Sequence, residues 1–415
     1  MKKAFLTCCL AAILVLGTSA PGRTQGNIRI GDKFTLPLGM DLETVFDDNI
    51  YLGSGDNVPT EEEVSDTILH IKPNVGLNYE MPERGNIFVG YEGDWANYSK
   101  ESENNWKTNK GLFDLNYQAP GGLLLGANNV YADAEDPYGD ATQFGLGQPL
   151  TKRWYDDFKS KVGWNFGNTT RAMALFNYYI QEYDQEIDKT QDHEDYEIGA
   201  GVEYKGLAKT WAFVRYHYGN VDWTGRPASL PGLNDTNDAD YTYHRINVGL
   251  TWDPGSKVSG ELNLGYQFNS FDNETDVNGN EYTDDDTWIA KTVINWQVYE
   301  NTLLFGSLMR AYRVTGAFSN EYFTDTGISL GVRHRFYTKF TAEALASYFR
   351  NEYNTNDRDD DNYELYAKLG YDVREWFNIA ASWYYREKDS SSNLPNPDYD
   401  DYKNNQIALI ASFQF

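Results

Sequence analysis

The last ten residues of the chain, 406–415, read QIALIASFQF. Apolar residues alternate there with polar or small ones, and one face carries Ile407, Leu409, Phe413 and Phe415. Alternation with a period of two is the pattern of a β-strand that has one apolar face. Chain ends usually fray in polar residues, whereas this chain stops on an aromatic ring. Such a strand needs an apolar environment on one side and water on the other, and lipid provides it if the pattern recurs.

The same alternation recurs along the whole chain. In residues 240–253, DYTYHRINVGLTWD, Ile246 and Val248 share one face, and Arg245 and Asn247 share the other. We predict eighteen strands of this kind. They lie at approximately 33–46, 66–80, 85–98, 107–118, 122–133, 153–165, 169–183, 195–205, 209–221, 241–252, 257–271, 287–298, 301–315, 325–337, 339–351, 362–373, 376–386 and 404–415.

The connections between these segments alternate in length. Short ones such as MPERG (81–85) and DPGS (253–256) alternate with long ones such as DNETDVNGNEYTDDD (272–286). An up-and-down transmembrane barrel has this arrangement, with short periplasmic turns and long extracellular loops. An even number of strands also places the first and the last residue of the barrel at the same rim. The pattern therefore predicts an all-β, antiparallel, transmembrane β-barrel of about eighteen strands with long acidic extracellular loops.

Composition favours membrane-crossing strands over membrane-crossing helices. The mean hydropathy is −0.64, yet aromatic residues make up 15 % of the chain. No apolar run reaches the length of about 20 residues that a transmembrane helix needs. In a barrel the apolar and polar residues alternate, so the hydropathy averages out. A large soluble β protein is the other class that this composition allows.

The first residues indicate export. Lys2 and Lys3 precede an apolar run at 4–16, and small residues follow it, which is the pattern of a secretory signal peptide. Both cysteines, Cys8 and Cys9, lie inside this segment, so the mature protein has no thiol for a disulfide, a metal site or catalysis. We predict a cleaved signal peptide at approximately 1–22, a short lead at 23–32 and the barrel at 33–415.

An aromatic residue stands just before each predicted short turn. Rings of this kind favour the boundary between membrane and water, so we predict an aromatic girdle at the inner interface, with the last residue of the chain as its last member. The predicted girdle residues are Tyr79, Tyr117, Trp164, Tyr204, Trp252, Trp296, Phe336, Tyr371, Phe413 and Phe415.

The formal net charge of −27 is unevenly distributed. The nine long loops with their flanks carry −32, so the strands and short turns of the mature chain carry about +3. Charges on a lipid-facing wall are costly, and strand charges are therefore expected to face the lumen or to pair across it. The predicted pore-lining cations are Lys159, Lys161, Arg215, Arg245, Lys291, Arg310, Arg333, Arg335, Lys368 and Arg386. The predicted lumenal carboxylates are Glu92, Asp94, Asp114, Glu197, Glu203, Glu261, Glu343 and Glu364.

One acidic loop approximates a calcium-binding pattern. Glu274, Asp276, Asn278 and Asp285 have some of the required spacing, but a calcium loop needs Asp at its first position, Glu at its twelfth and flanking helices. An acidic loop that faces lipopolysaccharide with loosely held cations is the preferred interpretation, and no cofactor is expected. Residues 134–152 are long and punctuated by Gly and Pro, so this loop either folds inward as a constriction or lies outside as a cap.

No catalytic motif is present, and we expect no enzyme. None of the five histidines forms HExxH, and no GxSxG or phosphate-binding glycine loop occurs. His193, within DHED, has carboxylates beside it, but a solvated loop explains that cluster better than a hydrolase site. The acidic loops also disfavour nucleic acid as a partner.

Two early stretches resemble a known family. They are ETVFDDNIYLGSGDNVPTEEEVSDTILHIKPNVGLNYE (43–80) and GNIFVGYEGDWANYSKES (85–102), and both are similar to the opening of the putative β-barrel porin family of outer-membrane proteins. Beyond residue 135 or so only the strand rhythm continues. The resemblance implies an integral protein of the bacterial outer membrane and carries over no catalytic residue. Members of that family often accompany exopolysaccharide synthesis, so it further implies a conduit for polymer export.

The expected function is therefore passage of a hydrated solute, with exopolysaccharide export as the leading interpretation. A general diffusion porin for small solutes and a non-conducting structural or adhesin barrel are the alternatives. The expected partners are outer-membrane lipid and lipopolysaccharide, the barrel-assembly machinery through the C-terminal strand, and periplasmic components of polysaccharide export. The sequence leaves open the solute, the direction of flow, the state of the pore and the number of subunits.

Overall fold

A computed structural model describes most of the barrel and parts of its loops. The described residues are 28–53, 63–137, 150–185, 188–225, 239–252, 255–275, 281–282, 286–314, 322–353, 358–391 and 401–415. The signal peptide predicted at 1–22 and the first half of the lead predicted at 23–32 lie outside them. No helix in this part of the chain has the length and apolarity needed to cross a membrane.

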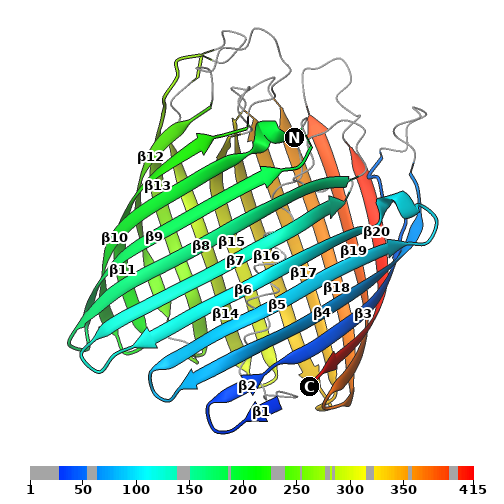
Figure 1. The fold of residues 1–415 in the computed structure, drawn as a ribbon, viewed down its shortest axis with the longest axis horizontal. Helices are drawn as coiled ribbons and strands as arrows, with labels where there is room; N and C mark the ends of the chain where they lie inside the picture. Colours follow the sequence, from blue (N-terminus) through cyan, green and yellow to red (C-terminus); the bar gives the residue numbers. More distant parts are fainter. Residues whose placement is uncertain are drawn as a thin grey trace.

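Eighteen antiparallel strands, β3 to β20, close into one barrel, and the predicted fold is confirmed (Figure 1). Each strand pairs with its neighbours in sequence, which is up-and-down order. Their bounds are β3 Leu38–Asp47, β4 Asp66–Met81, β5 Gly85–Tyr98, β6 Trp106–Gln118, β7 Leu123–Pro137, β8 Leu150–Phe166, β9 Thr170–Tyr183, β10 His193–Leu207, β11 Thr210–Trp223, β12 Tyr241–Trp252, β13 Val258–Phe271, β14 Thr287–Tyr299, β15 Thr302–Val314, β16 Tyr322–Phe336, β17 Phe340–Tyr353, β18 Asp359–Arg374, β19 Phe377–Ser391 and β20 Tyr402–Gln414. Two single-turn 3-10 helices, η1 Ser102–Asn104 and η2 Lys189–Gln191, lie in connections.

The C-terminal decapeptide closes this barrel. Strand β20 pairs with β19 on one side and with β3 on the other, in a register that places Gln406 opposite Asp47 and Gln414 opposite Gly39. The backbone N–H of Phe415 donates to the carbonyl of Leu38 at 2.7 Å. The apolar face of the last strand is therefore part of the outer wall, which explains why the chain ends on an aromatic ring.

The first predicted strand is interrupted at a proline. Pro37 separates β2 (Phe34–Leu36) from β3, because proline lacks the N–H that a continuous ladder would use. Strand β2 instead forms a small hairpin with β1 (Ile28–Ile30) and pairs with the end of β4, where Phe34 lies opposite Tyr79. This hairpin lies beside the C-terminus, at the rim that carries the short turns (Figure 1).

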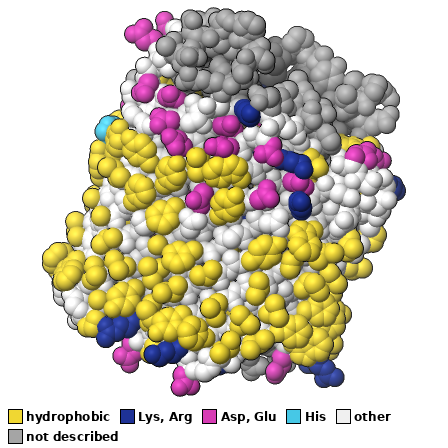
Figure 2. Space-filling model, viewed as in Figure 1, with side chains coloured by type: hydrophobic (Ala, Val, Ile, Leu, Met, Phe, Trp, Pro, Cys, Tyr) yellow, Lys and Arg dark blue, Asp and Glu magenta, His cyan; other side chains and the backbone are white. Residues whose placement is uncertain are grey.

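The two faces of the wall differ in chemistry. Successive residues of a strand point to opposite faces, and one face carries apolar side chains such as Val214 and Leu330, which expose 57 % and 63 % of their surface. On the face that Figure 2 shows, hydrophobic side chains form a broad band, and charged side chains lie mostly above and below it. The other face, which encloses the lumen, carries the ion-paired residues described below. Lipid outside and water inside fit this division.

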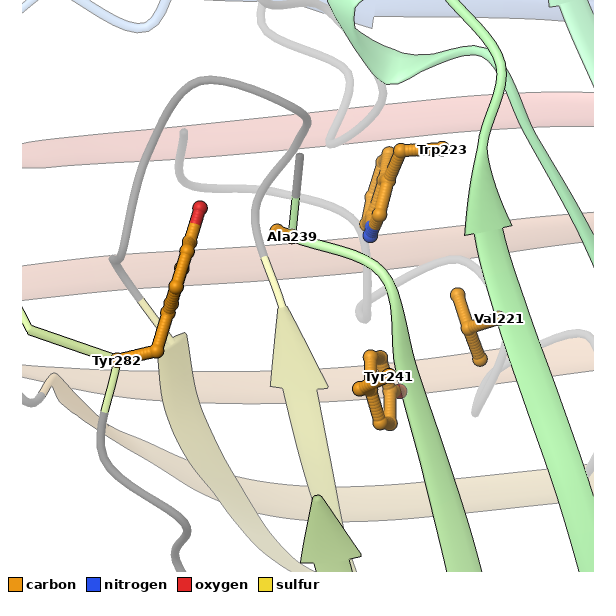
Figure 3. Close-up of a cluster of buried hydrophobic side chains, with 5 residues drawn as sticks. All are labelled: Val221, Trp223, Ala239, Tyr241 and Tyr282. Atoms are coloured by element: carbon orange, nitrogen blue, oxygen red, sulfur yellow. The ribbon is translucent and has the colours of Figure 1, made fainter. Parts of the chain in front are cut away.

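Small apolar clusters lie near the outer rim. One of them contains Val221 and Trp223 on β11, Tyr241 on β12, Ala239 just before β12, and Tyr282 in the connection between β13 and β14 (Figure 3). Buried aromatic contacts of this kind hold the ends of the long loops against the strands.

Candidate functional site

The candidate functional site is the lumenal wall, and nine of the ten predicted pore-lining cations lie on it. Strand alternation and pairing register place them there, on the face opposite the exposed apolar side chains. The nine are Lys159 and Lys161 on β8, Arg215 on β11, Arg245 on β12, Lys291 on β14, Arg333 and Arg335 on β16, Lys368 on β18 and Arg386 on β19. The eight predicted carboxylates share this face: Glu92, Asp94, Asp114, Glu197, Glu203, Glu261, Glu343 and Glu364.

Arg310 differs from this expectation and lies on the outward face. It is opposite Ala290 and Thr326, in phase with outward-facing Leu304. Its guanidinium lies 4.8 Å from the ring of Trp288, and it donates to the hydroxyl of Thr326 at 2.5 Å. A tryptophan ring and nearby polar groups compensate a charge at this position. Counting the alternation from Leu304 would have identified this face from the sequence.

One buried carboxylate connects two arginines on the lumenal wall. Glu203 on β10 is fully buried and pairs with Arg171 on β9. Arg215 on β11 donates to Oε1 of Glu203 at 2.9 Å and to Oε1 of Glu261 on β13 at 3.0 Å. The guanidinium carbon of Arg215 also lies 3.8 Å from the centre of the Phe213 ring. Positive and negative groups thus alternate across β9 to β13 and fix both arginines to the wall.

A second network surrounds Glu197. Its Oε1 accepts from Nδ2 of Asn177 at 2.8 Å and is 2.9 Å from Nδ1 of His217. Its Oε2 accepts from the hydroxyl of Tyr243 at 2.8 Å and from Arg245. Four donors on one carboxylate leave no lone-pair direction free for a metal or a substrate. Glu197 therefore belongs to the structure of the wall.

Further ion pairs lie around the lumen. Lys72 donates to Oε2 of Glu43 at 2.5 Å and is 3.7 Å from Asp94, which is also 2.8 Å from His70. On strands β16 to β18, Arg333 pairs with Glu343 at 2.6 Å, and Arg335 pairs with Asp372 at 2.8 Å. Lys72 and Arg171 are not among the predicted lumenal charges, although strand alternation alone assigns both to the inner face.

Three lysines are exposed inside the closed wall. Lys159, Lys161 and Lys291 are all solvent-exposed although they face the lumen. Lys159 has Asp157 as a partner at 2.5 Å, whereas Lys161 and Lys291 form no ion pair with any described residue. Lys291 on β14 interacts electrostatically with the cations Lys159 and Arg245 and with the carboxylates Asp157 and Glu197, so charges from separate strands of the wall act on it. These amines are available to a solute.

Glycines let large lumenal side chains lie flat against the wall. A Cβ atom added at Gly219 would be 2.2 Å from the Tyr243 ring, and one at Gly126 would be 2.4 Å from Cε of Lys161. Each such glycine is the cross-strand partner of the side chain above it. The same arrangement pairs Gly199 with His217, Gly201 with Arg215, Gly249 with Phe213, Gly265 with Asn247, Gly327 with Phe349 and Gly331 with Phe305. The side chains above these glycines therefore lie close to the backbone of the wall.

The ten predicted girdle residues all lie on the outward face, at the strand ends next to the short turns. Several of them stack in pairs. The ring of Tyr371 lies 4.8 Å from that of Phe340, and the ring of Phe413 lies 5.0 Å from that of Phe377. Trp376 stacks on Phe415 at 5.8 Å.

The loop hypotheses fall mostly outside the described residues. Asp276, Asn278 and Asp285 of the calcium-like pattern are not described, and neither is 138–149 of the candidate constriction loop. Glu274 is described, and no cluster of potential metal ligands occurs among the residues that the structure covers. His193 lies at the start of β10, where its ring packs 4.7 Å from Trp223 and Nδ1 lies 2.9 Å from the carbonyl of Gln191.

Comparison with known proteins supports a porin. The family described as Putative beta-barrel porin 2 matches residues 20–415, nearly the whole chain. No curated protein matches significantly.

Among solved structures, OpdK of Pseudomonas aeruginosa with vanillate is 10 % identical, with 92 % of this chain and 98 % of that chain covered and a TM-score of 0.43. OccK2 (OpdF) of P. aeruginosa with glucuronate is 8 % identical, with 92 % and 98 % covered and a TM-score of 0.44. OccAB4 of Acinetobacter baumannii is 10 % identical, with 92 % and 99 % covered and a TM-score of 0.42.

Proposed function

The chain belongs to the family described as Putative beta-barrel porin 2, and from this premise we propose that its lumen is a water-filled channel for small hydrated solutes. The observation that carries the proposal is the exposure of Lys159, Lys161 and Lys291 inside a closed wall. An ammonium group without an ion pair needs water or a counter-ion around it. The lumen beside Lys161 and Lys291 therefore has to admit water or small ions. Barrels of 16–18 strands are wide enough for an aqueous channel.

The glycines of the wall support the same proposal. A barrel that is closed by its own core needs side chains that meet across the axis, as in small eight-stranded barrels. In this barrel Tyr243, Phe213 and Arg215 instead lie along the wall above Gly219, Gly249 and Gly201. A non-conducting structural barrel has no need of this arrangement.

The channel prefers anions under this proposal. Lys161 and Lys291 have no carboxylate partner among the described residues, whereas the carboxylates Glu197, Glu203 and Glu261 are held by arginine. Glu92 on β5 is also exposed on this face without an ion pair among the described residues, so the proposed preference is local: the wall around Lys161 and Lys291 attracts anions and repels cations.

Export of an exopolysaccharide, which the family resemblance implied, finds no support in the comparisons, and a general diffusion porin fits them better. No contact in the described wall favours a long polymer over a small solute. We therefore propose no periplasmic export component as a partner. The proposed partners are outer-membrane lipid, lipopolysaccharide and the machinery that assembles the barrel through its C-terminal strand.

The test is the reversal potential of the purified protein in a planar bilayer under a KCl gradient. We expect current that favours chloride, and a shift toward potassium in the double variant Lys161→Gln/Lys291→Gln. Lys107→Gln is the matched control, because Lys107 lies opposite outward-facing Trp95, and its selectivity should equal that of the wild type. Absence of current from folded protein would contradict the channel, and an unchanged potential in the double variant would contradict the role of the lysines.

A further inference from the structure

We infer that the periplasmic half of the lumenal wall contains a binding subsite for a small organic anion with an apolar body, of which an aromatic monocarboxylate is the simplest example. This inference rests on the proposed function, because the ligand reaches the subsite only through the lumen. It adds a substrate class to the proposed function, because the charge of a free lysine does not by itself distinguish one monovalent anion from another.

The subsite is a cavity of about 670 Å³ in the wall between the short turns and the middle of the barrel. Its lining includes Lys161, Arg171 and Arg215, together with the carboxylates Glu203 and Glu261. Small-molecule sites of this size, roughly 300–1,000 Å³, combine apolar surface with a few fixed polar groups. The ion pairs described above hold both arginines in place without any ligand.

Two cations of the lining, Lys161 and Arg84, form no ion pair with any described residue, and Lys161 is the one that lies opposite the apolar Leu175. The stem of Lys161 lies across Gly126, where an added Cβ atom would approach Cε, Cγ and Cδ at 2.4, 2.9 and 3.2 Å. Its ammonium group is exposed and has no ion-pair partner among the described residues. An ammonium on a stem that is held against the wall loses less side-chain entropy on binding than a free one. A carboxylate is the chemical group that fits it.

The floor beside Lys161 is apolar, which a channel for hydrated ions does not require. Gly163 on β8 lies between Leu124 on β7 and Met173 on β9, and an added Cβ atom there would be 3.4 Å and 3.2 Å from their side chains. Leu175 continues the apolar surface opposite Lys161. All three apolar side chains line the same cavity.

The geometry defines the ligand. Gly163 is buried, and the side chains of Leu124 and Met173 pack close over it and line the cavity. Lys161 lies two residues away on the same strand and the same face. A flat or branched hydrocarbon body covers these apolar side chains and removes apolar surface from water, which stabilises the complex, while its carboxylate reaches the ammonium. Acetate has the charge without the body, and benzyl alcohol has the body without the charge.

The experiment is isothermal titration of the folded, full-length protein in detergent micelles with benzoate, acetate and benzyl alcohol, with empty micelles as the blank. We expect saturable binding of benzoate and affinities at least about tenfold weaker for the other two, a difference of about 1.4 kcal/mol. Lys161→Gln and Met173→Ser should each weaken benzoate binding by about tenfold. Met173→Leu, which keeps the apolar floor, and Lys107→Gln on the outer wall should bind benzoate like the wild type.

Equal affinities for benzoate and acetate, or unchanged binding in Met173→Ser, would overturn the subsite. Met173→Leu separates loss of the floor from a general disturbance of the wall, and native electrophoretic mobility of each variant shows that it has folded. The titration does not depend on conduction. Benzoate binding without chloride current would therefore remove the proposed channel and keep the subsite, whereas chloride current without benzoate binding would do the reverse.

Discussion

Glu203 shows how a single residue can divide the lumenal charges into two groups. Its carboxylate is fully buried and satisfied by Arg171 and Arg215, so these three residues build the wall. Lys161, on the neighbouring part of the wall, is exposed and has no such partner among the described residues. Formal charge alone does not distinguish the two groups, because the difference is one of burial and pairing.

Replacing Glu203 by Gln should destabilise the folded barrel by about 3–5 kcal/mol, because two guanidinium groups lose the buried charge between them. The measurement is urea unfolding of the protein in lipid bilayers. Glu352→Gln is the matched control, since Glu352 is half-exposed and 3.3 Å from Arg310, and its effect should be about 1 kcal/mol or less. An equal loss of stability in both variants would contradict the structural role of Glu203.

Residue-level prediction from the sequence depended on phase. Alternation assigned Lys159, Lys161 and Arg245 to the lumen, and the structure places them on that face. Alternation assigned Arg310 to the wrong face. Arg310 is an even number of residues from outward-facing Leu304 and therefore points outward as well. The pairing of Arg171 with Glu203 could not be predicted from the sequence. It depends on the register between β9 and β10, and a single sequence does not determine that register.

At the scale of elements, the seam between β3 and β20 is held by buried amides. Asn404 is fully buried and donates to Oδ1 of Asp47 at 2.5 Å and to the carbonyl of Asn49 at 3.2 Å, and it accepts from Nε of Arg386 at 3.2 Å. Nε2 of Gln406 donates to Oδ2 of Asp47 at 2.8 Å. Residues 46–51, which read FDDNIY, thus fix the outer end of the last strand to the first.

Asn404→Ala should therefore weaken barrel closure by about 1–3 kcal/mol, since it leaves buried groups of the seam unsatisfied. The temperature at which the folded band is lost in electrophoresis without boiling measures this effect. Asn405→Ala is the control one residue away, where the amide bonds Asp48 at an exposed position, and it should shift that temperature much less. A larger shift in the control would contradict the assignment of the seam to Asn404.

Element boundaries were predictable to within a few residues for most strands, because period-2 alternation is a local property. The break at Pro37 was missed, since the apolar pattern continues across it while the missing N–H interrupts the ladder. The glycines under Tyr243 and Lys161 were missed for a different reason. A lumenal glycine has meaning only together with its cross-strand partner, and the sequence does not give that partner.

At the scale of the whole molecule, closure, an apolar outer band and a charged inner face together define an outer-membrane barrel. The fold was predictable because every strand repeats one rule. The state of the pore was not, because residues 138–149 and other long-loop segments lie outside the described part of the chain. Passage through the lumen is thus a property to be measured directly.

The most direct measurement is swelling of liposomes that contain the purified protein, in iso-osmotic solutions of neutral sugars of increasing size. A water-filled lumen predicts rapid swelling with a pentose and slower swelling as the sugar becomes larger, because the rate follows the width of the channel. Liposomes with heat-unfolded protein provide the baseline. Rates equal to that baseline for every sugar, with the barrel folded, would contradict the central claim that this chain forms an open channel for small solutes.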